Sequence, residues 1–259
     1  MKMICIGHKA PVFDPGQEFM LVAPPSPDYR VDLEVPDDCF GPRFHGEMLA
    51  EYTQLFALAD FLKNHNADFE KFYIFQYRKF LALKTPSNLS QNMPYCYAAT
   101  GEESTKIFPS QQELDALPTD FLLSPNVRFD VTLAKGYAKS HVIEDFVCLT
   151  LAMREVPGFD LARCDRFINS LDMIPVPSLG VMTAPLFIQN MTVLRAVWDV
   201  FSTHYLKKRE GYQRRVGGFL LERLNSFLLQ EQFVDQNLAP VTWGNQVTVS
   251  DTEFVYATF

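Results

Sequence analysis

The segment Phe72-Tyr73-Ile74-Phe75-Gln76-Tyr77-Arg78-Lys79 sets a run of large apolar residues directly before a polar and cationic run. A short, continuous apolar run bounded by polar residues is typical of a strand that is buried in the core of a sheet. The sequence therefore predicts a buried strand over residues 72–75, and it places Gln76 to Lys79 at the carboxyl end of that strand.

The rest of the chain alternates between strand and helix patterns. Short apolar runs predict two more strands, over residues 4–6 and 19–22. Apolar residues at steps of three and four predict helices over residues 47–63, 140–154, 192–206 and 211–229. In the second of these helices, Ile143, Val147 and Leu151 are expected to face inward. Strands that alternate with helices indicate an α/β sandwich in a single domain, residues 1–259.

Two stretches are expected to lie outside this core. Residues 84–118 are punctuated by Pro, Ser and Asn, so we predict a loop-rich insertion there. Residues 230–259 follow the last predicted helix and are expected to form a C-terminal extension.

The charge balance of the chain excludes some classes of protein. Its 259 residues include 23 Lys and Arg against 31 Asp and Glu, which gives a net charge of −8. General nucleic-acid binders and polybasic membrane anchors both need clustered cations, so neither class is favoured. No apolar run reaches the length of a membrane helix. The five cysteines form no CxxC pair, so we expect reduced thiols in a cytoplasmic protein.

Several catalytic and nucleotide-binding motifs are missing from the sequence. It contains no GxxxxGK[ST], no GxGxxG after the first strand, no GxSxG and no HExxH. The chain is therefore not expected to be a P-loop protein, a dinucleotide-binding protein or an α/β-hydrolase, nor to hold a local histidine metal site.

Cationic side chains follow two of the predicted strands. His8 and Lys9 come after the first strand, and Tyr77, Arg78 and Lys79 come after the 72–75 strand. Ligands of open α/β sheets bind beyond the carboxyl ends of the strands, and cations there would suit a phosphate or diphosphate. The alternative is a solvated strand end, because charged side chains usually face water.

Acidic side chains offer candidates for proton transfer. Glu47 and Glu51 are four residues apart on one predicted helix, and His141 and Asp145 have the same spacing. A His–Asp pair that faces a cleft could act as a general base with its orienting group, whereas an exposed pair would be structural. The spacing leaves both interpretations open.

The last predicted helix carries three further charged candidates. Arg215 and Glu222 share one face and could pair along the helix. Arg223 lies beside the apolar face, so it could extend its charged end to water or join a buried ion pair.

Five segments occur in order between residues 6 and 224 and match a set of motifs. They are Ile6-Gly7-His8-Lys9, Glu51-Tyr52-Thr53-Gln54-Leu55-Phe56, Gln76-Tyr77-Arg78-Lys79, Tyr137-Ala138-Lys139-Ser140-His141 with Asp145, and the run from Tyr212 to Leu224. Together they resemble a family of bacterial capsular-polysaccharide and galactofuranosyl transferases. The chain departs from the family at Gln76, where the family has His, and at Lys79, where it has Arg.

This resemblance implies a Rossmann-like GT-A glycosyltransferase fold with a mixed central sheet and C-terminal helices. It also implies a nucleotide-sugar donor, with UDP as the expected nucleotide. The expected acceptor is a growing surface polysaccharide, such as capsule or O-antigen, or a lipid-linked saccharide. The location that follows is cytoplasmic, with peripheral contact to the inner face of the membrane.

The resemblance also suggests roles for the candidate residues. Arg78 and Lys79, together with Lys9, are expected to bind the diphosphate and so reduce the need for a metal. Asp145, oriented by His141, is the expected base. Glu51 is an alternative base or a ligand of sugar hydroxyls. The remaining expected substrate-binding residues are His8, Thr53, Tyr77, Arg215 and Glu222.

Asp37 and Asp38 are candidates for a divalent metal, Mn²⁺ or Mg²⁺. They echo the Asp-x-Asp that holds a metal in many sugar transferases, but they follow Pro36 in a predicted loop and do not end a strand. No cofactor is therefore assigned with certainty.

Two other functions are compatible with the same sequence. One is a non-catalytic module that binds a nucleotide or a sugar, and the other is a partner subunit of a polysaccharide-assembly complex.

Overall fold

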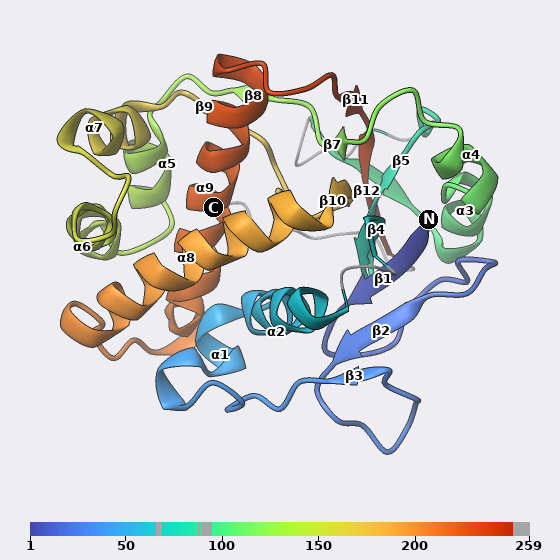
Figure 1. Cartoon of the computed structure of the whole chain (residues 1–259), viewed down its shortest axis with the longest axis horizontal. Coiled ribbons are helices and arrows are strands. Elements are labelled where there is room, and N and C mark those ends of the chain that lie inside the picture. The colour runs from blue at the N-terminus through green and yellow to red at the C-terminus, as the bar shows by residue number, and fades with distance from the viewer. Residues whose placement is uncertain (66–68, 88, 90–94, 251–259) are drawn as a thin grey trace.

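The computed structural model describes residues 1–259 with the exception of 66–68, 88, 90–94 and 251–259 (Figure 1). Within the described residues, ten strands form one mixed sheet. They are β1 (Lys2–Ile6), β2 (Met20–Ala23), β3 (Leu33–Glu34), β4 (Lys71–Gln76), β5 (Lys79–Ala82), β6 (Tyr97–Ala99), β7 (Leu122–Leu123), β10 (Gly180–Thr183), β11 (Thr242–Trp243) and β12 (Asn245–Val249). A separate antiparallel pair consists of β8 (Val127–Arg128) and β9 (Asp172–Met173).

The helices occupy most of the remaining described chain. The α-helices are α1 (Gly46–Leu49), α2 (Tyr52–Asn64), α3 (Gly101–Ile107), α4 (Gln111–Asp115), α5 (Leu133–Ala138), α6 (Ile143–Arg154), α7 (Leu161–Asn169), α8 (Ala184–His204) and α9 (Val216–Gln230). Short 3-10 turns span Pro42–Phe44 and Gly211–Arg215, and one π turn spans Glu231–Asp235. No helix in the described part of the chain combines the length and apolar character needed to cross a membrane.

The centre of the sheet is the parallel pair β1 and β4. Ile4 lies opposite Ile74, and Ile6 lies opposite Gln76, so both strands end at the same edge of the sheet. β2 continues the parallel pairing beyond β1, and β10 joins the other side of β4 in the antiparallel direction. This arrangement fixes where the residues that follow β1 and β4 must meet.

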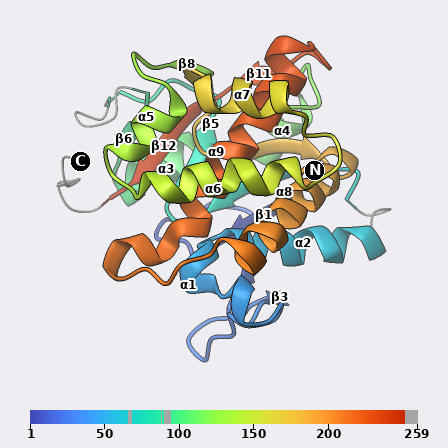
Figure 2. The same ribbon diagram turned by 90° about the vertical axis from the view of Figure 1, so that its left-hand side faces the viewer.

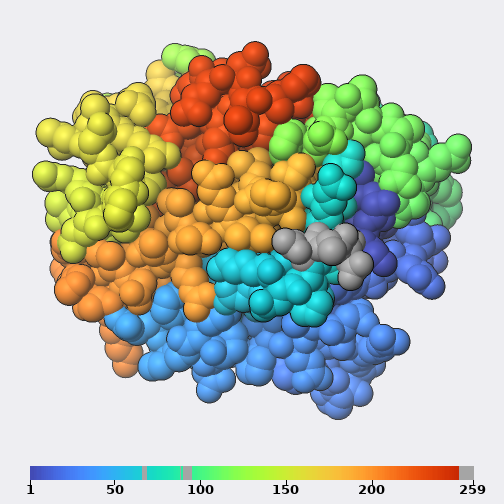
Figure 3. All heavy atoms as spheres, viewed as in Figure 1, coloured from blue at the N-terminus to red at the C-terminus, as the bar shows by residue number. Residues whose placement is uncertain are grey.

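Helices cover both faces of this central pair (Figure 1). On one face, the ring of Phe72 in β4 contacts the ring of Phe187 in α8, with centroids 5.4 Å apart. On the other face, the ring of Phe75 contacts Phe108, which follows α3, at 5.0 Å. In the space-filling view, α2 (cyan) and α8 (orange) lie directly against each other (Figure 3). Burial on both faces explains why β4 is a continuous apolar run.

The predicted strands over residues 4–6, 19–22 and 72–75 are confirmed as parts of β1, β2 and β4. The helices differ in their bounds. The helix predicted over 47–63 is divided into α1 and α2 at Ala50, where φ is 52°. The last helix begins as a 3-10 turn before α9.

The inward face predicted for α6 is wrong. Ile143, Val147 and Leu151 are 40%, 52% and 41% exposed, and Figure 2 shows α6 at the outside of the molecule. The buried face of the helix instead includes Phe146 and Asp145. Because the inner face includes the acidic Asp145, its apolar pattern is interrupted. The exposed stripe of Ile143, Val147 and Leu151 is the more regular apolar pattern in the sequence.

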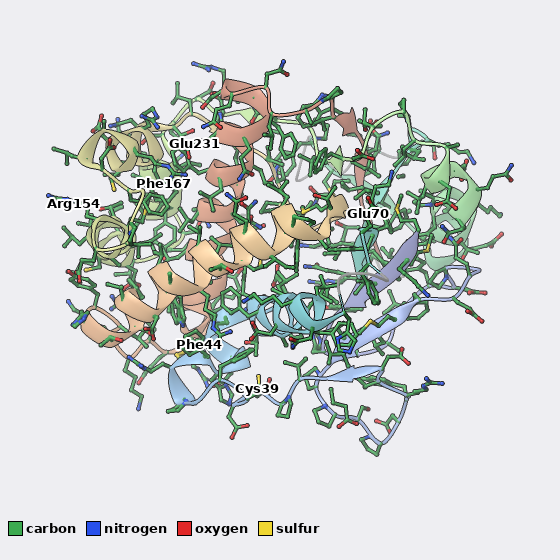
Figure 4. All side chains as sticks on the ribbon, in the orientation of Figure 1. Cys39, Phe44, Glu70, Arg154, Phe167 and Glu231 are labelled. Carbon is green, nitrogen blue, oxygen red and sulfur yellow. The ribbon has the colours of Figure 1, made fainter. Side chains whose placement is uncertain are left out.

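The charge of Asp145 is compensated from a distant part of the chain. Arg209 donates to both of its carboxylate oxygens, at 2.8 and 3.1 Å. A similar arrangement joins α7 to the end of α9, where Arg163 and Arg166 both pair with the buried Glu231 (Figure 4). These ion pairs fix the outer helices α6 and α7 to the C-terminal part of the fold.

The two stretches expected outside the core contribute regular structure to it. Residues 84–118 contain β6, α3 and α4, although 88 and 90–94 lie outside the described residues. Both helices begin with a reciprocal capping box, Thr100 with Glu103 and Ser110 with Glu113. From the expected C-terminal extension, β12 pairs with β5 and β6, while residues 251–259 are not described.

The close approach of β7 and β10 requires glycine at position 180. Gly180 has φ of +108°, and a Cβ there would overlap the backbone carbonyl of Leu122. We expect Gly180→Ala to lower the free energy of unfolding by about 2–4 kcal/mol, measured by denaturant titration. Gly16 also has positive φ, +69°, but no atom lies within 4 Å of its Cβ position. Gly16→Ala should therefore cost only about 1 kcal/mol, and equal losses would contradict the steric account.

The pair of Asp145 and Arg209 gives a second prediction. Their side chains are 4% and 18% exposed, so removal of the charge of Asp145 leaves Arg209 with only the exposed Glu144, 4.0 Å away. Asp145→Asn should lower the free energy of unfolding by about 3–5 kcal/mol in the same assay. The control is the neighbouring Glu144→Gln, which breaks a surface pair with Lys207 and should change stability little. A neutral Asp145→Asn would mean that the pair is dispensable.

Candidate functional site

A cavity of about 950 Å³ opens where β1 and β4 end. The carboxyl ends of these strands and the turn that follows β4 form one wall. The N-terminal half of α9 and the junction of α1 with α2 form another. Residues from these four elements that line it include Ile6, Gly7, His8, Gln76, Tyr77, Arg78, Lys79, Ala50, Glu51, Gly218, Phe219, Glu222 and Arg223. This is the edge at which ligands of open α/β sheets bind.

Most of the cations that line the cavity lack an acidic partner. Arg214 pairs with Glu47 at 2.9 Å. Arg78, Lys79, Arg215 and Arg223 also line the cavity, and none of them has an ion-pair partner within 4 Å among the described residues. Such cations can bind an anion without first giving up an existing ion pair, so the cavity is suited to an anionic ligand.

The ring of Tyr77 contacts two of the cations at this edge of the sheet, Lys9 and Arg78. The ammonium of Lys9 is 5.0 Å from its centroid and the guanidinium of Arg78 is 5.5 Å away. The ring of His8 meets it edge-on at 4.6 Å. Gly7 allows this approach, because a Cβ there would lie 3.2 Å from the Cβ of Tyr77. The structure thus brings together four residues that the sequence predicted at this site.

The neighbours of His8 favour its neutral form. Partial burial lowers its pKa, and the positive charges of Lys9, Arg78 and Arg215 lower it further. A neutral imidazole carries both a donor and an acceptor, so His8 can hydrogen-bond a phosphate oxygen or a sugar hydroxyl.

Two carboxylates lie on the opposite wall. Glu51 precedes α2 and accepts a hydrogen bond from the side-chain amide of Gln76, at 3.2 Å. Glu222 lies on α9, and its pKa is raised by burial and by the negative charge of Glu51. The pair predicted between Arg215 and Glu222 does not form, because Arg215 precedes α9 and lies 5.7 Å from the ring centroid of Phe219.

His141 lines the cavity on the side of α5. Its ring stacks on Phe219 with centroids 4.1 Å apart, and its Nδ1 is 3.2 Å from the side-chain oxygen of Gln213. Burial and the charge of Arg223 lower its pKa to about 4. His141 is therefore uncharged near neutral pH, and it is a weak proton acceptor there.

His141 and Asp145 do not form a hydrogen-bonded pair. α6 begins at Ile143, so His141 lies outside the helix and hydrogen-bonds Gln213, whereas Asp145 pairs with Arg209. Asp145 is buried, pairs with Arg209, and is not among the described residues that line the cavity. Thr53 is also buried, and its hydroxyl donates to the carbonyl of Phe44.

Of the two metal candidates, Asp37 lines the cavity and Asp38 does not. No three His, Cys, Asp or Glu side chains gather around a common point in the part of the chain that the structure describes. Mg²⁺ is often bound by one or two carboxylates together with substrate phosphates. A metal prediction therefore rests on Asp37 alone.

Sequence reasoning did not single out several residues of the cavity. Gln246 reaches it from β12, a strand in the expected extension, and no local pattern marks it. Phe219 appeared only as one position of a motif, yet it contacts His141, Tyr212 and Arg215. These positions depend on how distant segments pack.

Comparison with known proteins bears on the fold. No protein-family model matches the chain, and no curated protein matches it. The solved apo structure of WbbM, a bifunctional glycosyltransferase, superposes with a TM-score of 0.71 at 15% sequence identity. The match covers 99% of this chain and 47% of that one, so the chain spans about half the length of WbbM. The predicted fold class, a GT-A-like α/β fold with a mixed central sheet, is confirmed.

Proposed function

We propose that the chain is a glycosyltransferase that moves a sugar from a nucleotide-sugar donor to a saccharide acceptor. The observation that carries the proposal is the set of cations without ion-pair partners at the ends of β1 and β4. They lie in a fold that is similar to that of a bifunctional glycosyltransferase. Fold alone does not imply function, so the proposal rests mainly on the charged residues that line this cavity.

Transfer of a sugar from such a donor releases a nucleoside diphosphate, which carries most of the negative charge that develops in the reaction. Fixed cations that face this charge stabilise the transition state. Arg78 and Lys79 line the cavity, and Lys9 lies over the ring of Tyr77 beside them. In the proposal these three cations bind the diphosphate.

The size of the cavity supports a ligand larger than a nucleotide. Small-molecule sites usually enclose about 300–1,000 Å³, and this cavity is near the upper end of that range at about 950 Å³. Arg78 and Lys79 line the strand side of the cavity, and Glu51 and Glu222 lie on the helix side, so the two sides suit different parts of a substrate. In the proposal the diphosphate lies along Arg78 and Lys79, and the sugars extend toward Glu51 and Glu222.

The finer parts of the proposal come from the motif resemblance. They are a UDP-linked hexose or galactofuranose as donor, and a capsular polysaccharide, O-antigen or glycolipid as acceptor. A Mn²⁺ or Mg²⁺ ion near Asp37, a cytoplasmic location and contact with the inner face of the membrane belong to the same set of proposals.

Binding of the diphosphate gives a direct test. Arg78→Ala should weaken UDP binding by about 10- to 100-fold in calorimetric titration, because a charged hydrogen bond is lost. Lys106→Ala is the control. It removes an exposed cation on α3, and it should leave the affinity unchanged. Unchanged UDP affinity of Arg78→Ala would overturn the assignment of the diphosphate site.

Donor identity and turnover need a second experiment. A panel of nucleotide sugars, with and without Mn²⁺, should include a compound that raises the melting temperature, since binding to the folded state stabilises it. The same compound should slowly release its nucleoside diphosphate in the presence of the protein. Stabilisation without any release would favour a non-catalytic binding module over a transferase.

A further inference from the structure

The carboxylate wall depends on an unusually close contact between α9 and α1. A Cβ at Gly217 would lie 3.0 Å from the carbonyl oxygen of Met48, and a Cβ at Gly218 would lie 3.0 Å from the Cβ of Ala50. Consecutive glycines inside a helix weaken it, so their presence here indicates that the approach itself is required. α9 can therefore reach the end of α1.

This contact brings two acidic residues into one part of the cavity. Glu222 lies one helical turn after Gly218, on the same face of α9. That face is directed at Ala50, so Glu222 lies toward the next residue in the chain, Glu51. Both residues line the cavity, and the charge of each raises the pKa of the buried Tyr52.

Backbone strain at Ala50 supports a functional role for this junction. Its φ and ψ are 52° and −128°, a backbone conformation that residues other than glycine rarely adopt. Strained residues of this kind cluster at functional sites, where the surrounding structure holds them. Here the strain ends α1 and redirects the chain, so that Glu51 precedes α2 at the edge of the cavity.

The two carboxyl groups have different surroundings. Glu51 accepts a hydrogen bond from the side-chain amide of Gln76 at 3.2 Å. Burial and the neighbouring charge of Glu51 raise the pKa of Glu222, while Arg223, Lys79 and Arg215 oppose the shift. A raised pKa makes Glu222 a stronger base than an exposed glutamate.

We propose that Glu222 is the catalytic base of the reaction and that Glu51 is the positioning residue beside it; this inference rests on the proposed function. The acceptor oxygen attacks the anomeric carbon of the donor sugar, and a new C–O bond forms. The bond from that carbon to the diphosphate oxygen breaks, and its electron pair leaves with the diphosphate. The proton of the acceptor hydroxyl passes to the carboxylate of Glu222. A single displacement of this kind inverts the configuration of the sugar.

The alternatives on the page are less suitable for this role. Asp145 is bound through both oxygens by Arg209, and it does not line the described part of the cavity. His141 does line it, but its pKa of about 4 makes it a weak base near neutral pH. Glu222 lies one helical turn after Phe219, the ring on which His141 stacks. Glu222 is therefore the carboxylate on α9 next to these two rings.

Water can take the place of the acceptor, so hydrolysis of the donor tests the proposal without a known acceptor. We expect Glu222→Gln to slow the release of UDP from UDP-hexoses by about 100-fold or more. UDP affinity, measured by calorimetry, should stay within threefold of wild type or become tighter, because a negative charge is removed. Glu144→Gln on the surface of α6 is the control and should release UDP at the wild-type rate.

The pH dependence of the UDP release rate distinguishes a catalytic base from a glutamate with a purely structural role. The wild-type release rate should rise with pH as Glu222 ionises, and Glu222→Gln should lack this rise. Glu51→Gln should move the rise to lower pH, because it removes the charge that raises the pKa of Glu222. A release rate for Glu222→Gln within threefold of wild type would overturn the inference, as would loss of UDP binding in step with loss of release. If the wild-type protein released no UDP from any UDP-hexose, the proposed function itself would fail.

A measurement of stability checks the ionisation of Glu222 without any substrate. Its pKa is raised in the folded state, so the stability it contributes is full below the ordinary glutamate pKa and is lost as pH rises through the folded value. The melting temperature of the wild-type protein should therefore fall across that interval more than that of Glu222→Gln. Identical pH profiles would contradict the raised pKa and with it the choice of Glu222.

Discussion

The parallel pairing of β1 with β4 is the constraint on which the rest of the molecule depends. Because Ile6 lies opposite Gln76, the two strands end together, and the residues that follow them share one edge of the sheet. The contact of His8 with Tyr77 is a direct result, and Gly7 leaves room for it. Without this register, cations from two distant parts of the sequence would not face one cavity.

A second contact gives the cavity its opposite wall. α9 approaches the end of α1 through two glycines, and it thereby brings Glu222 and Arg223 to the space above the sheet. The result is a cavity with cations on both sides, Arg78 and Lys79 from the strands and Arg215 and Arg223 from the helix side, where Glu51 and Glu222 also lie. The net charge of −8 does not oppose an anionic ligand, because the local charge of the cavity wall decides what it binds.

The sequence predicts the parts of this arrangement that follow from local patterns. β4 is buried on both faces, so it is a continuous apolar run, and the cations that follow it could be assigned to the edge of the sheet. The ion pair of Asp145 could not be predicted, because its partner, Arg209, lies far away in the sequence and because α6 begins after His141. Gln246 could not be found at all, since its place depends on the pairing of β12 with β5.

The two departures from the motif acquire a physical meaning in the structure. At the first, the amide of Gln76 donates to Glu51. An amide does not titrate, so this donor stays the same over the pH range in which a histidine would change its charge. At the second, Lys79 keeps a positive charge at the cavity but gives up the bidentate geometry of arginine. Neither departure removes a positive charge that the proposed diphosphate site uses, so both are consistent with the proposed function.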